Sequence, residues 1–122
     1  MNKTQNHRGS IHSEEKLVQI IVHVANSVQP DAIICAVETQ AFAQGLHSLL
    51  EQFRVITVTT NKETYDVLTQ MDLEAILLPI LAADKYKQVL YIISVAFKAE
   101  KISIGDFVVC AIGPDVYQEE GD

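Results

Sequence analysis

Two consecutive copies of one pattern occupy the region from Asp31 to Leu68: a short apolar run, a polar corner and an amphipathic segment. The apolar runs cover 32–37 and 55–60, and the amphipathic segments that follow them begin at Ala41 and Lys62. A short β-branched or apolar run that gives way to helical spacing is typical of a βα unit. Two such units with almost no linker predict a buried parallel sheet whose polar corners lie together at one edge.

The segments on either side of this repeat continue the alternation of helices and strands. A first helix is predicted to begin near Ser13, whose side chain can cap it. After the repeat, a strand over 74–79 ends at Pro79, a long helix follows Asp84 as its cap, and a last strand covers 107–112. We expect the long helix to bury one apolar stripe, made of Tyr86, Val89, Leu90, Ile93, Ala96 and Phe97.

The length and composition favour one globular core. The chain has 122 residues, of which 48% are hydrophobic, and it is too short for two ordinary domains. We therefore predict the α/β class, as a three-layer α/β/α sandwich around a mostly parallel sheet of at least four strands. Residues 13–114 form this single domain in the prediction. Residues 1–12 are expected to be a flexible N-terminal tail, and residues 115–122 an acidic tail or the start of a linker to a further domain.

Charge and hydropathy argue against two classes of partner, nucleic acid and membranes. The formal net charge is −7, and the nine lysines and arginines are scattered along the chain. Binding to nucleic acid depends mainly on clustered basic residues, so no nucleic-acid partner is expected. No apolar stretch approaches the roughly 20 residues that cross a bilayer, and the first ten residues lack the apolar core of a signal peptide. We expect no membrane partner and a cytoplasmic protein.

Common metal and cofactor motifs are missing from the sequence. Cys35 and Cys110 each lie in an apolar run, where a thiol behaves as a small buried hydrophobe, and no Cys/His spacing matches a zinc site. Dinucleotide-binding, Walker A and Gly-x-Ser-x-Gly motifs do not occur. We therefore expect no metal and no cofactor, and we interpret His23 and His47 as solvated helix histidines rather than catalytic bases.

Glu38 is the carboxylate best placed for function. It follows the first predicted strand, at the edge where ligands of open α/β sheets bind. Neighbouring hydroxyl and amide groups would complete a small polar pocket there. The candidate ligand-binding residues are Glu38, Thr39, Gln40, Thr59, Thr60, Asn61 and Gly113. In the competing interpretation, Thr39 and Asn61 only cap their helices and Glu38 is a solvated corner residue.

Two functions of other classes stay open from the residues alone. An assembly domain would expose an apolar strip on the long helix that mediates a symmetric dimer. In the alternative interpretation, the same strip is buried because the long helix packs on two neighbouring elements. The candidates for that strip are Tyr86, Tyr91, Ile92 and Val95. A small enzyme would need a perturbed acid or base, for which Glu38 is the only well-placed candidate. We favour a chain without catalytic residues.

Four local motifs, in register between Ser13 and Gly113, resemble the C-terminal domain of pyruvate kinase and its stand-alone relatives. They are Glu38-Thr39 at the first corner, Val58-Thr59-Thr60-Asn61 with Thr64 at the second, Pro79, and Gly105-Asp106 with Val108-Val109 and Gly113. The resemblance implies a three-layer α/β/α fold. It does not imply kinase activity, because the 122 residues cannot hold the catalytic barrel of pyruvate kinase.

The first corner departs from the family pattern. In pyruvate kinases that bind a sugar bisphosphate effector, this corner presents hydroxyls and backbone N–H groups to phosphate. Gln40, Ala41 and Phe42 stand here at the positions of the glycine, the basic residue and the hydroxyl. These residues argue against an effector of that kind.

Within this class the chain is most similar to the N-terminal module of some archaeal and bacterial diadenylate cyclases. The cyclase motifs Asp-Gly-Ala and Arg-His-Arg do not occur in it, so any cyclase activity would reside beyond residue 122. The resemblance implies a non-catalytic regulatory, ligand-sensing or dimerisation module. Its implied partners are a small-molecule or nucleotide ligand, a second copy of the chain and a downstream domain. The alternative is a free-standing α/β protein that binds a small metabolite, phosphorylated or not, or a small enzyme that uses Glu38.

Overall fold

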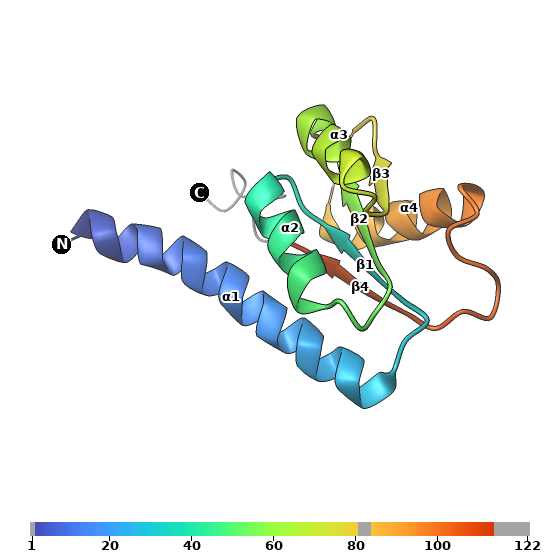
Figure 1. Ribbon diagram of the computed structural model, residues 1–122, viewed down its shortest axis with the longest axis horizontal. Coiled ribbons are helices and arrows are strands. Elements are labelled where there is room, and N and C mark those ends of the chain that lie inside the picture. The colour runs from blue at the N-terminus through green and yellow to red at the C-terminus, as the bar shows by residue number, and fades with distance from the viewer. Residues whose placement is uncertain (1, 81–83, 114–122) are drawn as a thin grey trace.

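The computed structural model describes residues 2–80 and 84–113, with side chains from Glu15 onward except that of Lys85. Helices and strands alternate along these residues (Figure 1). In chain order they are α1 (Asn2–Val28), β1 (Ala32–Ala36), α2 (Gln40–Leu49), β2 (Val55–Thr59), α3 (Lys62–Gln70), β3 (Ala75–Leu77), α4 (Lys85–Lys98) and β4 (Val108–Ile112).

The strands of the described residues form one all-parallel, four-stranded sheet in the order β3-β2-β1-β4. Strand β1 is central: Ile34 pairs with Ile56 of β2 on one side and with Cys110 of β4 on the other. All five residues of β1 and all five of β2 are buried. The predicted fold class is therefore confirmed, including the parallel sheet of four strands.

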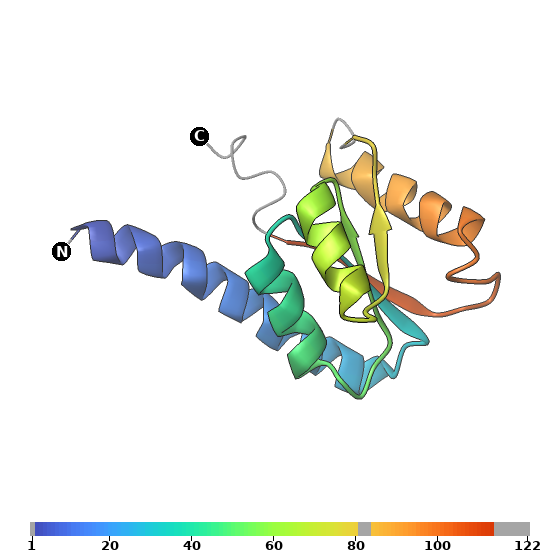
Figure 2. The same cartoon turned by 45° about the horizontal axis from the view of Figure 1, so that its top comes forward.

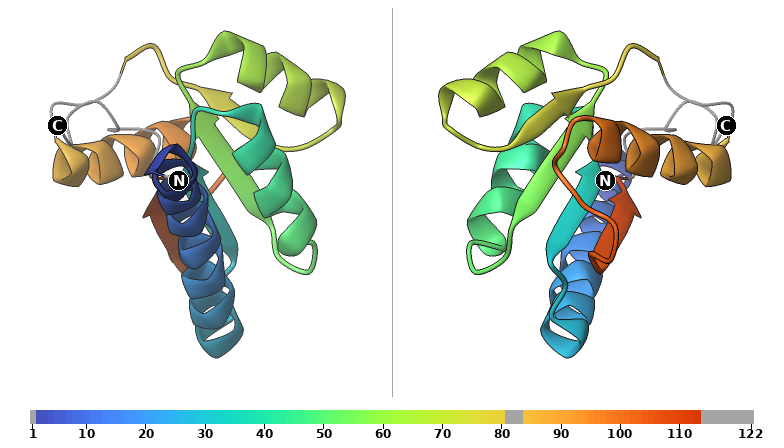
Figure 3. Two further views of the ribbon diagram at one scale, coloured as in Figure 1. Left: turned by 90° about the vertical axis from the view of Figure 1, so that its left-hand side faces the viewer. Right: turned by 90° about the vertical axis from the view of Figure 1, so that its right-hand side faces the viewer.

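Alternate residues of the strands pack into two separate cores, one on each face of the sheet. On the first face, Ile33 and Cys35 of β1 belong to a core that also includes Ile21 of α1, Leu46 of α2 and Leu68 of α3. The second core includes Ile34 and Ile56 from the strands together with Ile92 and Ala96 of α4. Figure 3 shows the sheet between α2 and α4. Burial on both faces explains why the β1 and β2 sequences are apolar or β-branched without interruption.

Side-chain hydrogen bonds cap the amino-terminal ends of α3 and α4 at the residues that the sequence indicates. Asn61 Oδ1 accepts a hydrogen bond from the Thr64 N–H at 3.2 Å and caps α3. Asp84 caps α4 in the same way, accepting from the Lys87 N–H at 2.8 Å. Before β4, Gly105 adopts φ +96°, a conformation that favours glycine. Each of these signals acts within a few residues, which is why the sequence is sufficient to find it.

Helix α1 begins earlier than predicted. Ser13 lies inside α1, which starts at Asn2, so the prediction that Ser13 caps the helix is wrong. Once a helix is formed, each added residue costs less than the first turn, and a polar segment of adequate propensity can extend it. The amino-terminal half of α1 runs beyond the sheet and the other helices (Figures 1 and 2). The flexibility expected for residues 1–12 stays a prediction, and the expected tail at 115–122 lies outside the described residues.

The buried side of α4 also differs from the predicted stripe. Tyr86, Leu90 and Phe97 are exposed by 75%, 56% and 46%, whereas Ile92 is fully buried. The predicted dimer strip therefore fails at Ile92, and its members Tyr91 and Val95 are half-buried beside the second core. Apolar residues occupy so much of the α4 circumference that spacing alone does not indicate which side meets the sheet.

Two glycines provide a matched test of backbone conformation. A Cβ at Gly45 or Gly105 would meet no atom within 4 Å, so sterics against neighbours do not distinguish them. Gly105→Ala is expected to lower the free energy of unfolding by about 1–3 kcal/mol, because φ +96° strains an L-residue. Gly45→Ala, inside α2, should raise it by up to about 1 kcal/mol. Urea denaturation measures both, and a change of the same sign in the two variants would contradict the assigned conformations.

The two thiols should react at different rates in the native protein. Cys35 is fully buried in β1, while Cys110 of β4 is half-buried and burial raises its pKa to about 11. Near pH 8 we expect iodoacetamide to modify Cys110 slowly, because little thiolate is present, and Cys35 only after unfolding. Mass spectrometry of labelled Cys35→Ser and Cys110→Ser variants assigns the rates. Labelling of Cys35 as fast as in urea would contradict its place in the core.

Candidate functional site

The polar corners after β1 and β2 are joined through one carboxylate. Glu38 Oε1 accepts a hydrogen bond from the Thr60 N–H at 3.1 Å, and Glu38 Oε2 accepts one from the Thr60 hydroxyl at 2.7 Å. Both residues are half-buried. The sheet brings these two corners together because parallel strands end at the same edge. The sequence prediction that Glu38 and Thr60 lie close together is therefore confirmed.

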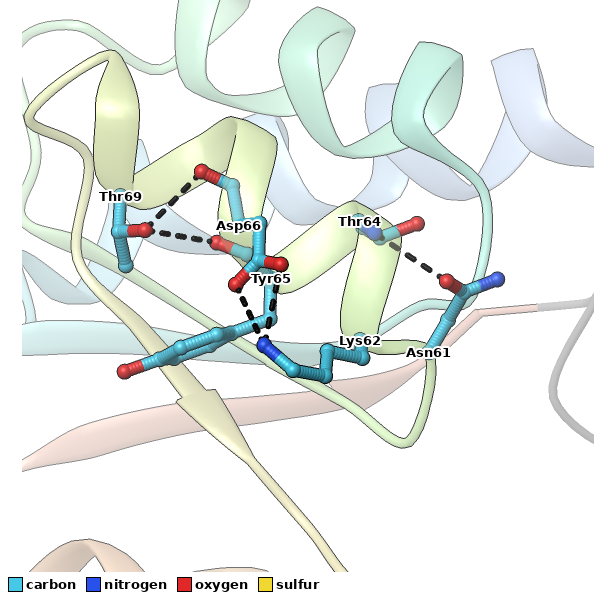
Figure 4. Close-up of polar contacts among 6 residues, drawn as sticks. All are labelled: Asn61, Lys62, Thr64, Tyr65, Asp66 and Thr69. Carbon is cyan, nitrogen blue, oxygen red and sulfur yellow. Dashed lines mark hydrogen bonds and ion pairs between the residues drawn. The ribbon is translucent and has the colours of Figure 1, made fainter.

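The second corner is tied back to the first by α3. Thr64 Oγ1 donates a hydrogen bond to the Glu38 carbonyl oxygen at 2.8 Å, and Thr64 is almost completely buried. The Asn61 cap holds the backbone of the same residue (Figure 4). Thr59 Oγ1 accepts a hydrogen bond from the Asn61 N–H at 3.1 Å. The start of α3 is therefore held by the corner after β1, by Thr59 of β2 and by its own cap.

The other three candidate residues border this network. The Gly113 N–H donates to the Ala36 carbonyl oxygen at 2.6 Å, which places the end of β4 beside the end of β1. Thr39 takes the N-cap position of α2 with extended backbone, and among the described residues its side chain makes no capping hydrogen bond. Gln40 is the first residue of α2 and is half-buried. All seven candidates thus lie at or shortly after strand ends at one edge, and hydrogen bonds join Glu38 to Thr60 and Asn61 to Thr59.

The direct effect of these hydrogen bonds is to stabilise the two corners rather than to form a reaction centre. Both carboxylate oxygens of Glu38 accept hydrogen bonds from Thr60, which orients the carboxylate toward its own protein. A ligand donor could use the remaining lone pairs of the carboxylate or replace the Thr60 hydroxyl. The competing interpretation is correct for Asn61, which caps α3, but Glu38 is not simply a solvated residue.

His47 is a polar residue that the sequence analysis misplaced. It is half-buried, and its Nε2 lies 2.8 Å from Thr57 Oγ1 of the buried strand β2. Burial lowers the pKa of His47, and the nearby Glu74 carboxylate partly opposes this effect. Arg54 binds Glu74 through two hydrogen bonds of 2.7 and 2.8 Å, which hold the pKa of Glu74 below its ordinary value. The sequence carried no local signal for this position, because the burial of His47 depends on its contact with Thr57 of the next strand. His23, in contrast, is exposed as predicted.

A groove between α1 and α2 is a second feature that the sequence analysis did not find. Its volume is about 690 Å³. Both apolar and polar side chains line it, and they are Glu15, Val18, Gln19, Val22, His23 and Asn26 of α1 and Ala41, Phe42, Gly45 and Leu49 of α2. The spacing on α1 indicates only a helix, because a groove depends on how two helices are placed by the sheet.

The described part of the chain has neither a cluster of metal-ligating side chains nor a membrane-spanning helix. No group of three or more His, Cys, Asp or Glu side chains there could hold a metal ion. Among the same residues, no helix combines the length and apolar character that a membrane span needs.

The fold is similar to part of pyruvate kinase. Two crystal structures of pyruvate kinase from Cryptosporidium parvum match with a TM-score of 0.67 and 19% sequence identity. The matches cover 84% and 83% of this chain and 21% of each pyruvate kinase chain, so the chain spans about a fifth of their length. No protein-family model and no curated protein matches the sequence. At this identity the likeness establishes a pyruvate-kinase-like fold.

The hydroxyl of Thr60 should contribute measurably to stability. Thr60→Val removes the donor to Glu38 Oε2 and keeps the backbone donor to Oε1. We expect the free energy of unfolding to fall by about 1–2 kcal/mol, because a hydrogen bond to a charged group is lost. Thr60→Ser keeps the hydroxyl and serves as the matched control. Urea denaturation that gives equal values for the Val and Ser variants would argue against the Glu38 bond.

His47 should make stability depend on pH. Because its pKa is lowered in the folded protein from 6.5, the unfolded chain binds the proton more readily as the pH falls through that value. The stabilising contribution is complete above about pH 6.5 and is lost progressively below it. Between pH 7 and pH 5, Tm should fall less in His47→Gln than in the unmodified protein. His23→Gln, at an exposed position of α1, is the control, and an equal effect of both substitutions would contradict this assignment.

Proposed function

We propose that this chain is a non-catalytic regulatory module that acts by forming a symmetric dimer through α4. The observation that carries the proposal is an exposed apolar row on this helix. Tyr86, Leu90 and Phe97 are exposed, and half-buried Ile93 lies between them in the sequence. Their spacing of four, three and four residues is that of a helix-packing seam.

The position of this row on α4 supports a partner other than the sheet. Ile92 and Ala96 are fully buried and belong to the second core, so they mark the side of α4 that meets the sheet. At 100° per residue, Leu90 and Phe97 lie on a different side of the helix. A symmetric dimer needs the same patch on both copies, and two α4 helices packed row against row satisfy this requirement.

The size of the row favours a dimer that dissociates readily. A standard interface buries about 800 Å² on each partner, more than a few side chains of one helix supply. Ile104 and Phe107, in the segment after α4, are also exposed apolar residues that a dimer could use. Association that responds to concentration or to a covalently attached domain suits a regulatory module.

We also propose that the module is the N-terminal part of a longer protein such as a diadenylate cyclase. The support is the set of sequence motifs together with a fold that spans about a fifth of the pyruvate kinases it resembles. The intact mass of the endogenous protein tests this part separately. A mass well above 13.5 kDa would support a module attached to another domain, and a mass of 13.5 kDa would contradict it.

Substitutions on α4 test the dimer. Leu90→Glu should raise the dimer dissociation constant at least about tenfold, because a carboxylate would be buried at the seam. Met71→Glu, at an exposed position at the end of α3, is the matched control for added charge. Sedimentation equilibrium measures the dissociation constants, and circular dichroism checks that the helices are intact. A chain that stays monomeric at about 100 μM, or a dimer unaffected by Leu90→Glu, would contradict the proposal.

A second candidate function is binding of a small metabolite at the Glu38 corner, with or without turnover. The gathering of all seven candidate residues at one sheet edge favours it. Titration with ribose, a neutral ligand whose hydroxyls can donate to Glu38, provides the first test when amide NMR shifts of Thr39 to Asn61 are followed. Glu38→Gln should then alter the corner shifts or any turnover and leave dimerisation unchanged. Uniform shifts across the chain would contradict a site at this corner.

A further inference from the structure

We propose that the groove between α1 and α2 binds an amphipathic helix that carries lysine or arginine, supplied by another protein. The groove and the α4 row belong to different helices on opposite faces of the sheet, so this binding is independent of the proposed dimer. The periodicity of the lining residues, the open space above α2 and the charge of the groove favour such a partner.

The α1 wall of the groove has the periodicity of a helix-packing surface. Its lining residues follow a spacing of three, one, three, one and three residues, as Glu15, Val18, Gln19, Val22, His23 and Asn26. Such a series forms successive four-residue holes into which side chains of a neighbouring helix fit. At 1.5 Å per residue the wall is on the order of 16 Å long, or about three helical turns. A linear helical partner matches this surface better than a compact small molecule does.

The α2 wall leaves room for such a partner. Ala41 and Gly45 are one helical turn apart, and a Cβ built on Gly45 would meet no atom within 4 Å. Small residues allow the axis of a packed helix to come close. Leu49, one turn further on, is 64% exposed and can cover an apolar side chain. At this end of the groove, Gln52 Nε2 donates to Asn26 Oδ1 at 3.2 Å and joins α1 to the segment after α2.

The polarity of the groove specifies the kind of helix. Val18 and Val22 are half-buried against the first core, and Phe42 is buried, so an apolar row of the partner would lie on them. Further from the core, α1 presents polar groups, and Glu15 is the one formally charged side chain among the described lining residues. The chain as a whole carries −7. A partner with basic residues beside its apolar row is therefore attracted at long range and complements Glu15 on contact.

The test uses a synthetic amphipathic helix of about 18 residues, with leucines on one face and lysines on the other. A peptide with glutamate in place of every lysine is the matched probe for charge. Fluorescence anisotropy of labelled peptides measures binding to the full chain and to three variants. Gly45→Leu fills the groove, Glu15→Lys reverses its charge, and Leu90→Ser changes only the α4 row and serves as the control.

We expect the lysine peptide to bind at least about tenfold more tightly than the glutamate peptide. Gly45→Leu and Glu15→Lys should each weaken its binding severalfold, and Leu90→Ser should leave it unchanged. Equal binding to the unmodified chain and to Gly45→Leu would mean non-specific attraction to an acidic protein and would overturn the proposal. Failure of the lysine peptide to bind would overturn it as well. So would dissociation of a dimer by Gly45→Leu but not by Leu90→Glu, because a second copy would then occupy the groove.

Discussion

Burial of two parallel strands on both faces is the constraint on which the rest of this structure depends. β1 and β2 are buried at every position, so helices must cover the sheet on both sides. The connections between parallel strands supply these helices and bring the chain back to the same edge for each strand. The meeting of Glu38, Thr60 and Thr64 follows from this geometry, and their hydrogen bonds fasten the corners that the topology creates.

The helices are distributed unevenly over the two faces of the sheet. α1, α2 and α3 contribute to the core of the first face, whereas α4 contributes to that of the second (Figure 3). Among the described residues, α4 is the one helix that contributes to the second core, and its accessible surface includes an apolar row. On the first face, two neighbouring helices create a groove instead. The two proposed contacts therefore use these helix surfaces, whereas the hydrogen bonds of the polar corner stabilise the fold.

Short-range signals were predictable from the sequence, and long-range packing was not. The Asn61 and Asp84 caps depend on contacts within a few residues, and both were found. The candidate corner residues could be grouped because parallel strands end together, but the bonds from Thr60 to Glu38 could not be derived from spacing. The exposed side of α4 and the burial of His47 depend on how helices are placed by the whole sheet, which no local pattern specifies.

Disulfide trapping detects the proposed contact between the apolar rows of two α4 helices. In a chain with Cys110→Ser, a Leu90→Cys substitution places a thiol on the row, and Met71→Cys places one at an exposed position at the end of α3. Under mild oxidation of dilute protein, we expect a covalent dimer from Leu90→Cys and little from Met71→Cys. Equal yields from the two variants, or no covalent dimer from Leu90→Cys, would contradict the proposed dimer.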